Sequence, residues 1–515
     1  MHKIASWITG HELPSIILLS LVFFTLRLLQ IDQCFAGLHV DEAGIKYDAY
    51  ALAEFHVDRY LNSFPVYMIN YGGGQSCLYT YLVALLFKIT GSTSTFLLRL
   101  PIVISNYLLC LCSALLVRDF KGKAAGIAGF AVFILMPYAV MQSRFGLDCN
   151  LLVSSLAIVT YCLHRAVQKK GCLRFFAVGI LIGVALYTYS LSWLIYPVYL
   201  IILLVLLLRF HQIDARGILC LLIPAAILAV PLFLFLYINL TGAPTMHVWI
   251  FTIPHLPQFR AGELSAANIM QNWKILATFL TSDSYSYNAD SRIGAVNYIM
   301  IPVFIIGVFA MFRSLQKQEA HDMSLEHYAL ASFSSVYLIA LLTKDCNISK
   351  GNGIYYSIFL IEMLGLICLY HQRKAAFHII FSIYLATSFL FAALLPKLLS
   401  SPLYLFSDSY GEAIALAEKK YPSLPIYAET LTKSPSGFYL AEALPDPYSL
   451  TISEDGLTIN QIHFSLPEDL HQPGVYIMTE SNVEAISDLY AYYEQYPEKV
   501  ILSSYGEYQI YVVLS

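Results

Sequence analysis

Two adjacent carboxylates stand early in the chain, in the segment His39-Val40-Asp41-Glu42. A carboxylate can serve as a general base, because it accepts the proton of a hydroxyl group that attacks an electrophilic carbon. The residues that follow favour a helix, and an acidic side chain at the start of a helix can also cap its free N–H groups. Asp41, with Glu42 beside it, is therefore predicted to be catalytic, and a helix cap is the alternative for Asp41.

A glycine-rich segment follows in the same stretch of chain, at Tyr71-Gly72-Gly73-Gly74-Gln75-Ser76. Glycines let a backbone approach a ligand closely. A glycine-rich turn that leads into a helix also offers N–H groups to a phosphate or a sugar hydroxyl. Gly73 and Gln75 are therefore predicted to contact substrate, and a flexible hinge is the simpler alternative.

A third polar segment, Ser143-Arg144-Phe145-Gly146-Leu147-Asp148-Cys149-Asn150, combines a carboxylate with a cation. Asp148 is predicted to act with Asp41, or else to cap the following helix or pair with Arg144. Asp41 and Asp148, together with His255, could ligate a divalent cation such as Mg²⁺ or Mn²⁺. Their spacing does not require a metal, so a site without a cofactor is equally open.

Positive charge is needed wherever a phosphate leaves, because it stabilises the departing oxyanion. Lys350 follows an apolar stretch and would lie at the depth of lipid headgroups, where it could bind a phosphate. A lone lysine at such a boundary can instead be a membrane anchor whose stem lies in the apolar layer. Arg144, His255 and Arg260 are the other candidates for phosphate binding.

The composition places most of the chain in a membrane. Of the 515 residues, 58% are hydrophobic and 12% are charged, and the mean hydropathy is +0.64. A soluble chain is about one-quarter charged, so a water-soluble enzyme is excluded. The net charge of −4 gives no bulk electrostatic reason to bind nucleic acid.

Apolar stretches of roughly 20 residues, the length that crosses a bilayer, predict about eleven transmembrane helices. They lie at 14–31, 100–117, 124–140, 150–166, 175–190, 191–210, 218–238, 296–312, 328–342, 354–370 and 377–395. The apolar stretch 78–89 is about a dozen residues long, which is too short for a span. It is predicted to be a juxtamembrane helix along the membrane surface.

Lysine and arginine fix the predicted orientation, because cytoplasmic loops are enriched in both. If 78–89 does not cross, five loops that carry these residues share one side: 118–123, 165–174, 209–216, 313–321 and 371–374. The loops 32–99 and 239–295 then lie outside the cytoplasmic membrane. Asp41, Asp148 and Lys350 face outward with them.

The end of the chain has a different pattern. Residues 1–398 hold all the predicted spans, whereas 399–515 lack long apolar runs. A helical stretch at 411–420 and strand-like runs at 425–428, 475–478, 500–502 and 509–514 follow. Residues 399–515 are therefore predicted to form a small extracytoplasmic α/β domain.

These features together resemble the GT-C superfamily of membrane glycosyltransferases. The resemblance covers roughly residues 13–240. It rests on His39-Val40-Asp41-Glu42, the glycine-rich segment, Phe96-Leu97-Leu98-Arg99-Leu100-Pro101, and Pro137 with the third polar segment. The pattern is most similar to bacterial relatives of the protein O-mannosyltransferases and of the lipid A aminoarabinose transferases, of the glycosyltransferase family 39 type.

The resemblance implies transfer of a hexose or pentose from a polyprenyl-phosphate donor to an acceptor hydroxyl on a glycan, a lipid or a protein. Asp41 would be the base of the first outer loop, and Asp148 would complete the site. Direct attack by the acceptor would invert the anomeric carbon, so no nucleophilic carboxylate is required. Some GT-C enzymes use a divalent cation and others act without one. The identities of the sugar and the acceptor stay open.

A transporter or flippase of lipid-linked sugar is the alternative function. Such a protein places paired ionisable residues within its spans and breaks helices in related halves. Glu362, in an otherwise apolar span, is a residue of that kind. A non-catalytic assembly subunit is a third alternative. The acidic residues of the outer loops favour the enzyme.

Overall fold

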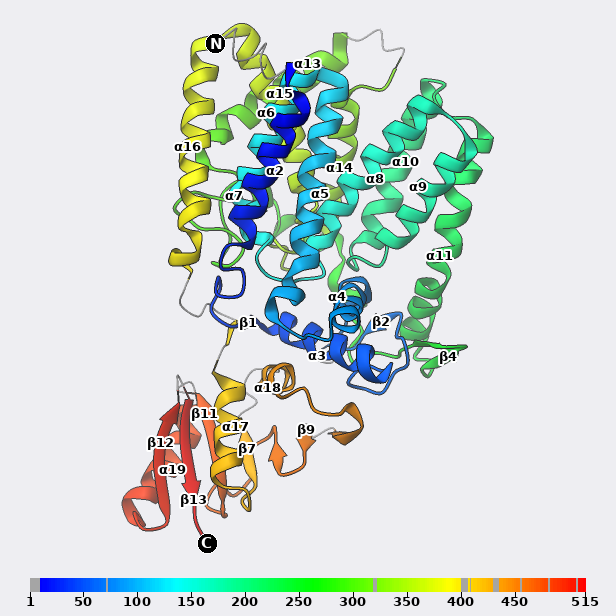
Figure 1. The fold of residues 1–515 in the computed structure, drawn as a ribbon. Coiled ribbons are helices and arrows are strands. Elements are labelled where there is room, and N and C mark those ends of the chain that lie inside the picture. The colour runs from blue at the N-terminus through cyan, green and yellow to red at the C-terminus, as the bar shows by residue number, and fades with distance from the viewer. Residues whose placement is uncertain are drawn as a thin grey trace.

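The computed structural model describes residues 10–70, 73–317, 322–399, 406–407, 409–428, 435–453, 456–479, 482–505 and 508–515. Long helices form a bundle, and short helices and loops lie across one end of it (Figure 1). A seven-stranded sheet with its own helices lies beyond that end. The chain thus has a helical part and a C-terminal α/β part, as the sequence predicted.

Each segment predicted to span the membrane contains a helix. The helices are α2 (Glu12–Leu28), α5 (Thr95–Lys121), α6 (Lys123–Leu135), α7 (Pro137–Gln142), α8 (Asn150–Lys169), α9 (Cys172–Ala185), α10 (Ser192–Arg209), α11 (Ala215–Thr241), α13 (Ile301–Lys317), α14 (Leu325–Leu342), α15 (Ile354–Gln372) and α16 (Lys374–Leu398). Eight of the described helices are long and apolar enough to cross a bilayer, if α13 is joined to η3 (Tyr298–Met300). The polytopic membrane fold is confirmed, and the count of about eleven spans stays a prediction.

The predicted span 124–140 is broken in the structure. α6 ends at Leu135 and α7 begins at Pro137, with the extended residue Met136 between them. The residue before a proline is disfavoured in the α conformation, which explains the break. α7 then ends at Gln142 and leads into the turn that carries Asp148.

Small residues allow the bundle helices to approach closely. A Cβ at Gly307 of α13 would collide with the carbonyl of Ile361, and a Cβ at Gly365 of α15 would collide with the carbonyl of Val303. Close backbone approach at small residues is a common way for helices to pack in a membrane, where burial of apolar surface drives little association. Larger residues at these two positions would separate α13 from α15.

Short elements from two loops lie across one end of the bundle (Figure 1). The first loop holds β1 (Leu38–His39), α3 (Val40–Phe55), the hairpin β2 (Tyr67–Met68) and β3 (Gln75–Ser76), and α4 (Cys77–Thr90). The second loop holds β4 (Met246–Val248), β5 (Phe251–Ile253), η1 (Ala261–Glu263), η2 (Ala266–Met270) and α12 (Ile275–Leu280). The predicted juxtamembrane helix 78–89 falls within α4, whose 14 residues are too few for a span.

The C-terminal part is a mixed sheet between helices. Its elements are β6 (Phe406–Ser407), α17 (Tyr410–Lys420), β7 (Ile426–Ala428), α18 (Pro435–Ala443), η4 (Pro447–Ser449), β8 (Leu450–Ser453), β9 (Gly456–Ile459), β10 (Ile462–His463), β11 (Gly474–Thr479), α19 (Val483–Gln495), β12 (Val500–Tyr505) and β13 (Tyr508–Val513). The strand order is β12-β13-β11-β7-β10-β9-β8. Strand β7 runs parallel to β10 and β11, and the other pairs are antiparallel. α17 and α18 share one hydrophobic core with the sheet, and α19 shares another.

The C-terminal part packs directly on the first loop. Tyr47 and Ala51 of α3 belong to the same hydrophobic core as α17, α18 and the sheet. The Tyr47 hydroxyl donates a hydrogen bond to the carbonyl of Pro445 at 2.9 Å. Strand β6 pairs antiparallel with β1, just before α3 begins. The helix that carries Asp41 is therefore held by the C-terminal part on the side away from the bundle (Figure 1).

Candidate active site

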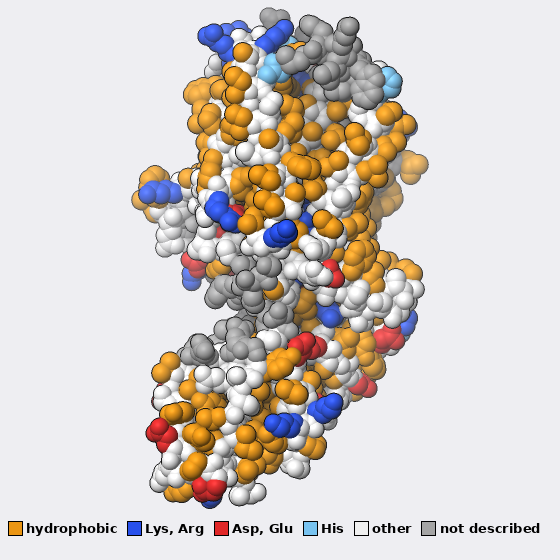
Figure 2. All heavy atoms as spheres, turned by 60° about the vertical axis from the view of Figure 1, so that its left-hand side comes forward, with side chains coloured by type: hydrophobic (Ala, Val, Ile, Leu, Met, Phe, Trp, Pro, Cys, Tyr) orange, Lys and Arg blue, Asp and Glu red, His pale blue; other side chains and the backbone are white. Residues whose placement is uncertain are grey.

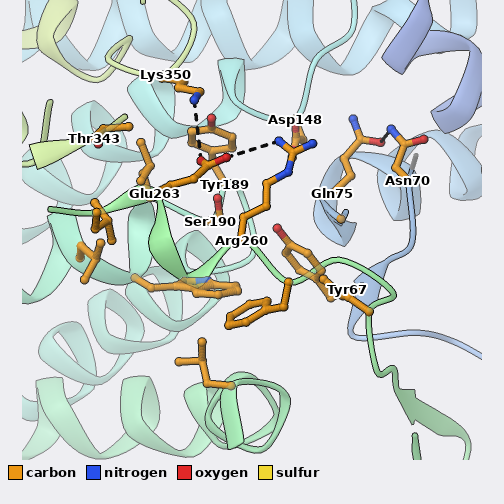
Figure 3. Close-up of a pocket in the computed structure, with 18 of the residues that line it drawn as sticks. Tyr67, Asn70, Gln75, Asp148, Tyr189, Ser190, Arg260, Glu263, Thr343 and Lys350 are labelled. Carbon is orange, nitrogen blue, oxygen red and sulfur yellow. Dashed lines mark hydrogen bonds and ion pairs between the residues drawn. The ribbon is translucent and has the colours of Figure 1, made fainter. Parts of the chain in front are cut away.

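A cavity of about 470 Å³ lies where the first and second loops meet the bundle. Its polar side chains include Asp41, Asn70, Gln75, Asp148, Arg260, Glu263 and Lys350. Its apolar side chains include Leu191, Trp193 and Leu194 around the start of α10, and Leu236 and Leu240 of α11. One cavity thus joins a charged end to a hydrophobic wall (Figure 3).

Asp41 lies in the first turn of α3 with its carboxylate at the cavity. The N-cap of this helix is His39, whose Nδ1 accepts a hydrogen bond from the Asp41 N–H at 3.1 Å. The Asp41 side chain, 36% exposed, accepts a hydrogen bond from Asn70 Nδ2 at 3.2 Å. Because His39 supplies the cap, the carboxylate of Asp41 stays available to a ligand.

Glu42 faces the opposite way and is fully buried. Its two oxygens accept hydrogen bonds from Nε and Nη2 of Arg99, each at 2.9 Å, and one also accepts from the Gly146 N–H at 2.6 Å. Burial favours the neutral acid, but the charge and hydrogen bonds of Arg99 outweigh it and hold the pKa of Glu42 below its usual value. Glu42 therefore anchors α3 to α5, and the structure does not bring it into the cavity.

Asp148 lies in the turn between α7 and α8 and borders the cavity. Oδ2 accepts a hydrogen bond from the Ser76 N–H at 3.0 Å, and Oδ1 accepts one from the Cys149 N–H at 2.9 Å. Burial raises the pKa of Asp148 to about 7, the charge of Asp41 adds to the rise, and the Ser76 hydrogen bond opposes it. The alternative for Asp148, a pairing with Arg144, is not formed: the hydrogen bonds of Asp148 come from Ser76 and Cys149.

Of the glycine-rich segment, Gly74 and Gln75 line the cavity, whereas Gly73, a predicted substrate contact, does not. Tyr71 and Gly72 fall outside the described residues. A Cβ at Gly74 would collide with the ring of Tyr67, and a Cβ at Gly73 would lie 3.1 Å from Arg260 Nε. Gln75 Oε1 accepts a hydrogen bond from Asn70 Nδ2 at 3.2 Å. The glycines thus allow close packing around Tyr67 and Arg260.

Two of the predicted phosphate-binding residues, Arg260 and Lys350, meet at the cavity. Glu263 lies between them: its carboxylate is 3.7 Å from Nη1 of Arg260 and 3.7 Å from Nζ of Lys350 (Figure 3). Lys350 Nζ also donates a hydrogen bond to the carbonyl of Lys344 at 2.9 Å. These cations come from the second loop and from the turn between α14 and α15, so the fold brings together charges far apart in sequence.

The structure places the other two predicted phosphate ligands elsewhere. Arg144 is buried and donates hydrogen bonds to the carbonyls of Leu26 and Leu29 at the end of α2. His255 is exposed, and its backbone N–H donates a hydrogen bond to Thr245 Oγ1 at 3.0 Å. Neither residue lines the cavity. Arg144 instead ties the turn before α8 to α2.

Comparison with known proteins relates part of this chain to a glycosyltransferase family and nearly all of it to the fold of solved membrane glycosyltransferases. Residues 75–238 match the family model of the dolichyl-phosphate-mannose-protein mannosyltransferases. No curated protein matches the chain by sequence. ArnT from Cupriavidus metallidurans in the apo state aligns over 96% of this chain and 97% of its own, with a TM-score of 0.59 at 11% identity. The chain has the GT-C fold.

Two further structures agree with this assignment. ArnT from Cupriavidus metallidurans bound to undecaprenyl phosphate aligns over 96% of this chain and 97% of its own, with a TM-score of 0.56 at 11% identity. The Archaeoglobus fulgidus oligosaccharyltransferase, in complex with Zn and sulfate, aligns over 84% of this chain and 61% of its own, with a TM-score of 0.51 at 14% identity. The resemblance to GT-C glycosyltransferases predicted from the sequence is confirmed for the fold.

Within this GT-C fold, two polar residues of the cavity, Asn70 and Glu263, were not predicted from the sequence. Asn70 donates to both Asp41 and Gln75 and so links the first loop's polar groups. A Cβ at Gly44, inside α3, would lie 3.0 Å from Asn70 Oδ1. A glycine costs stability in the middle of a helix, and Gly44 was the one available sign that another group approaches α3 closely.

A metal requires several ligands at one point, and Asp41 and Asp148 are the predicted pair. Both border the cavity, and the amides of Asn70 and Gln75 lie beside them. Within the described ranges, no group of three or more His, Cys, Asp or Glu side chains is placed to hold a metal ion. His255, the third suggested ligand, does not line the cavity. A divalent cation would therefore depend on Asp41, Asp148 and groups from the substrate.

Proposed function

We propose that this integral membrane protein transfers a sugar from a polyprenyl-phosphate donor to an acceptor hydroxyl, with inversion and with Asp41 as the base. The observation that carries the proposal is the composition of the cavity. It holds a solvent-accessible carboxylate and two cations at one end and a hydrophobic wall at the other. A lipid-linked sugar phosphate has the same order of groups: a polar sugar, an anionic phosphate and an apolar chain.

In the proposed reaction the acceptor hydroxyl attacks the anomeric carbon and Asp41 takes its proton. The new C–O bond forms as the bond between the anomeric carbon and the phosphate oxygen breaks, and the lipid phosphate leaves as an anion. Arg260 and Lys350 stabilise that anion. A single displacement inverts the anomeric centre, so a second nucleophilic carboxylate has no role.

The other two predicted catalytic carboxylates are assigned supporting roles. Glu42 fixes the first turn of α3 through Arg99, which sets the position of Asp41. Asp148 accepts the Ser76 N–H and so fixes the end of the β2–β3 hairpin beside the cavity. Asp148 also faces the charge of Asp41, and its ionisation sets the net charge of the cavity near neutral pH.

The hydrophobic wall supports a lipid donor. In the apolar stretches of α10 and α11, 39% and 33% of the residues are buried in the protein, so most of these residues face outward. Leu240, which lines the cavity, is also largely exposed at the end of α11. A chain that enters the cavity could therefore continue into the surrounding lipid. ArnT, the relative with bound undecaprenyl phosphate, supports a ligand of this class.

The proposed orientation puts the cavity on the outer face of the cytoplasmic membrane. On the face shown in Figure 2, hydrophobic side chains cover the bundle, Asp and Glu lie toward the cavity end, and Lys and Arg lie at both ends of the bundle. The loops 118–123 and 371–374, which carry Lys and Arg and are predicted to be cytoplasmic, lie at the end opposite the C-terminal part (Figure 1). Cytoplasmic loops are the ones enriched in Lys and Arg. The C-terminal part would then be extracytoplasmic and near the acceptor.

The test uses purified protein in vesicles with a radiolabelled polyprenyl-phosphate sugar and a mixture of candidate acceptors. A transferase releases polyprenyl phosphate and labels an acceptor. A flippase, the alternative function, moves the intact lipid across the bilayer without cleaving it. Movement without cleavage would refute the proposal, and Glu362 of α15, whose oxygens lack hydrogen-bond partners among the described residues, would then be the residue to examine.

A further inference from the structure

Glu263 sits where the proposed reaction needs a phosphate. Its carboxylate lies between the guanidinium of Arg260 and the ammonium of Lys350, at 3.7 Å from each (Figure 3). A carboxylate and a phosphate make the same demand on such a pair of cations, since both present anionic oxygens to N–H donors. The two anions therefore compete for one place.

The backbone of Glu263 is firmly held, whereas its side chain is not. The Glu263 carbonyl accepts hydrogen bonds from the Lys344 N–H at 2.7 Å and from Asn268 Nδ2 at 3.1 Å. Leu264, the next residue, forms a β-bridge with Thr343. Both ion pairs of the carboxylate, at 3.7 Å, are longer than a hydrogen bond. The side chain can thus turn away while η1 stays in place.

The side chain of Arg260 is more exposed than that of Lys350, and this difference suits an exchange of one anion for another. The side chain of Arg260 is 63% exposed, and that of Lys350 is 23% exposed. Lys350 is also tied to the carbonyl of Lys344. Lys350 can therefore hold a fixed position while the Arg260 fork adjusts to the incoming group.

We infer that Glu263 is an internal counter-ion that occupies the phosphate position until the donor's phosphate displaces it. The inference rests on the proposed function, because it takes the phosphate of a polyprenyl lipid as the competing anion. Glu263 keeps the two cations from repelling each other in the empty cavity. It also weakens the hold on the product, polyprenyl phosphate, and so speeds its release.

The test compares binding of undecaprenyl phosphate to the wild-type protein and to Glu263→Gln, which keeps the size of the side chain and removes its charge. We expect the Kd to fall about tenfold in Glu263→Gln and turnover to slow, because product release becomes harder. Glu484→Gln, at an exposed position of α19, removes the same charge far from the cavity and should leave the Kd unchanged.

Two further arms separate a lipid phosphate from a free anion and a folding defect from a loss of competition. Millimolar inorganic phosphate should compete with the lipid in Glu263→Gln but not in the wild type. Glu263→Asp, which draws the carboxylate back, should give an intermediate Kd. An equal or higher Kd in Glu263→Gln, with binding by the wild type intact, would overturn this inference alone. Absence of binding by both folded proteins would overturn the proposed function and this inference with it.

Discussion

The two sides of the first turn of α3 show how neighbouring carboxylates acquire different roles. On the cavity side, the Asp41 carboxylate accepts one hydrogen bond from the described residues, from the Asn70 amide, and is partly exposed. On the bundle side, Glu42 is fully buried and accepts hydrogen bonds from Arg99, Gly146 and the His39 N–H. A carboxylate whose oxygens are all occupied cannot take a proton from a substrate. The comparison therefore assigns a catalytic role to Asp41 and a structural role to Glu42.

The buried side should be the more sensitive to mutation. Glu42→Gln leaves the charge of Arg99 buried without its counter-ion, and breaking a buried pair in this way costs about 3–5 kcal/mol. We expect a large loss of folded protein, measured by thermal unfolding and size-exclusion chromatography in detergent. A Glu42→Gln protein that unfolds at the wild-type temperature but is inactive would make Glu42 a catalytic group and undo the comparison.

On the cavity side, the next largest effect is expected for the phosphate contacts. Lys350→Gln removes an ammonium group from the cavity, so the KM for the polyprenyl-phosphate sugar should rise about tenfold, or about 1.4 kcal/mol. Lys344→Gln is the matched control, because this exposed lysine lies in the same turn and does not line the cavity. Equal effects of the two changes would show that Lys350 acts only as surface charge.

A smaller effect should appear as a pH dependence. The pKa of Asp148 is about 7, so its proton is lost as the pH rises from 6 to 8. The new negative charge repels the donor's phosphodiester, which stays singly charged across this range. The KM for the donor should therefore rise about fivefold, or about 1 kcal/mol, over those two pH units. In Asp148→Asn the KM should be flat across the range, and an unchanged pH profile in that variant would contradict the assignment.

Local patterns in the sequence predicted much of the fold, and tertiary contacts decided the rest. The length of each apolar stretch identified the bundle helices and the short helix α4. A helix that crosses lipid must be long enough to span it and must satisfy its backbone hydrogen bonds internally, and both requirements act on each segment separately. The break at Met136 was not predicted, because hydrophobicity runs through it unbroken and the effect of Pro137 on the preceding residue was not considered. The short strands β8 to β10 were not predicted. Strands of so few residues show no clear alternation of apolar and polar side chains, and only pairing with neighbouring strands defines them.

The same division applies to the site. Polar residues placed on one side of the predicted topology include Asp41, Asp148 and Lys350, and the structure brings these three to one cavity. The sequence could not separate Asp41 from Glu42, because Arg99, the partner that buries Glu42, lies 57 residues away. It could not place Arg144 either, since the carbonyls that bind its guanidinium belong to α2.

The most direct test of the account is the rate of sugar transfer by Asp41→Asn in purified, folded protein supplied with a polyprenyl-phosphate sugar and its acceptor. Loss of a general base should lower kcat by about 10²–10⁴-fold, with the unfolding temperature and the donor Kd close to wild type. Glu54→Gln is the matched control, because Glu54 is an exposed carboxylate near the other end of α3, and it should keep full activity. Wild-type transfer by folded Asp41→Asn would contradict the central claim.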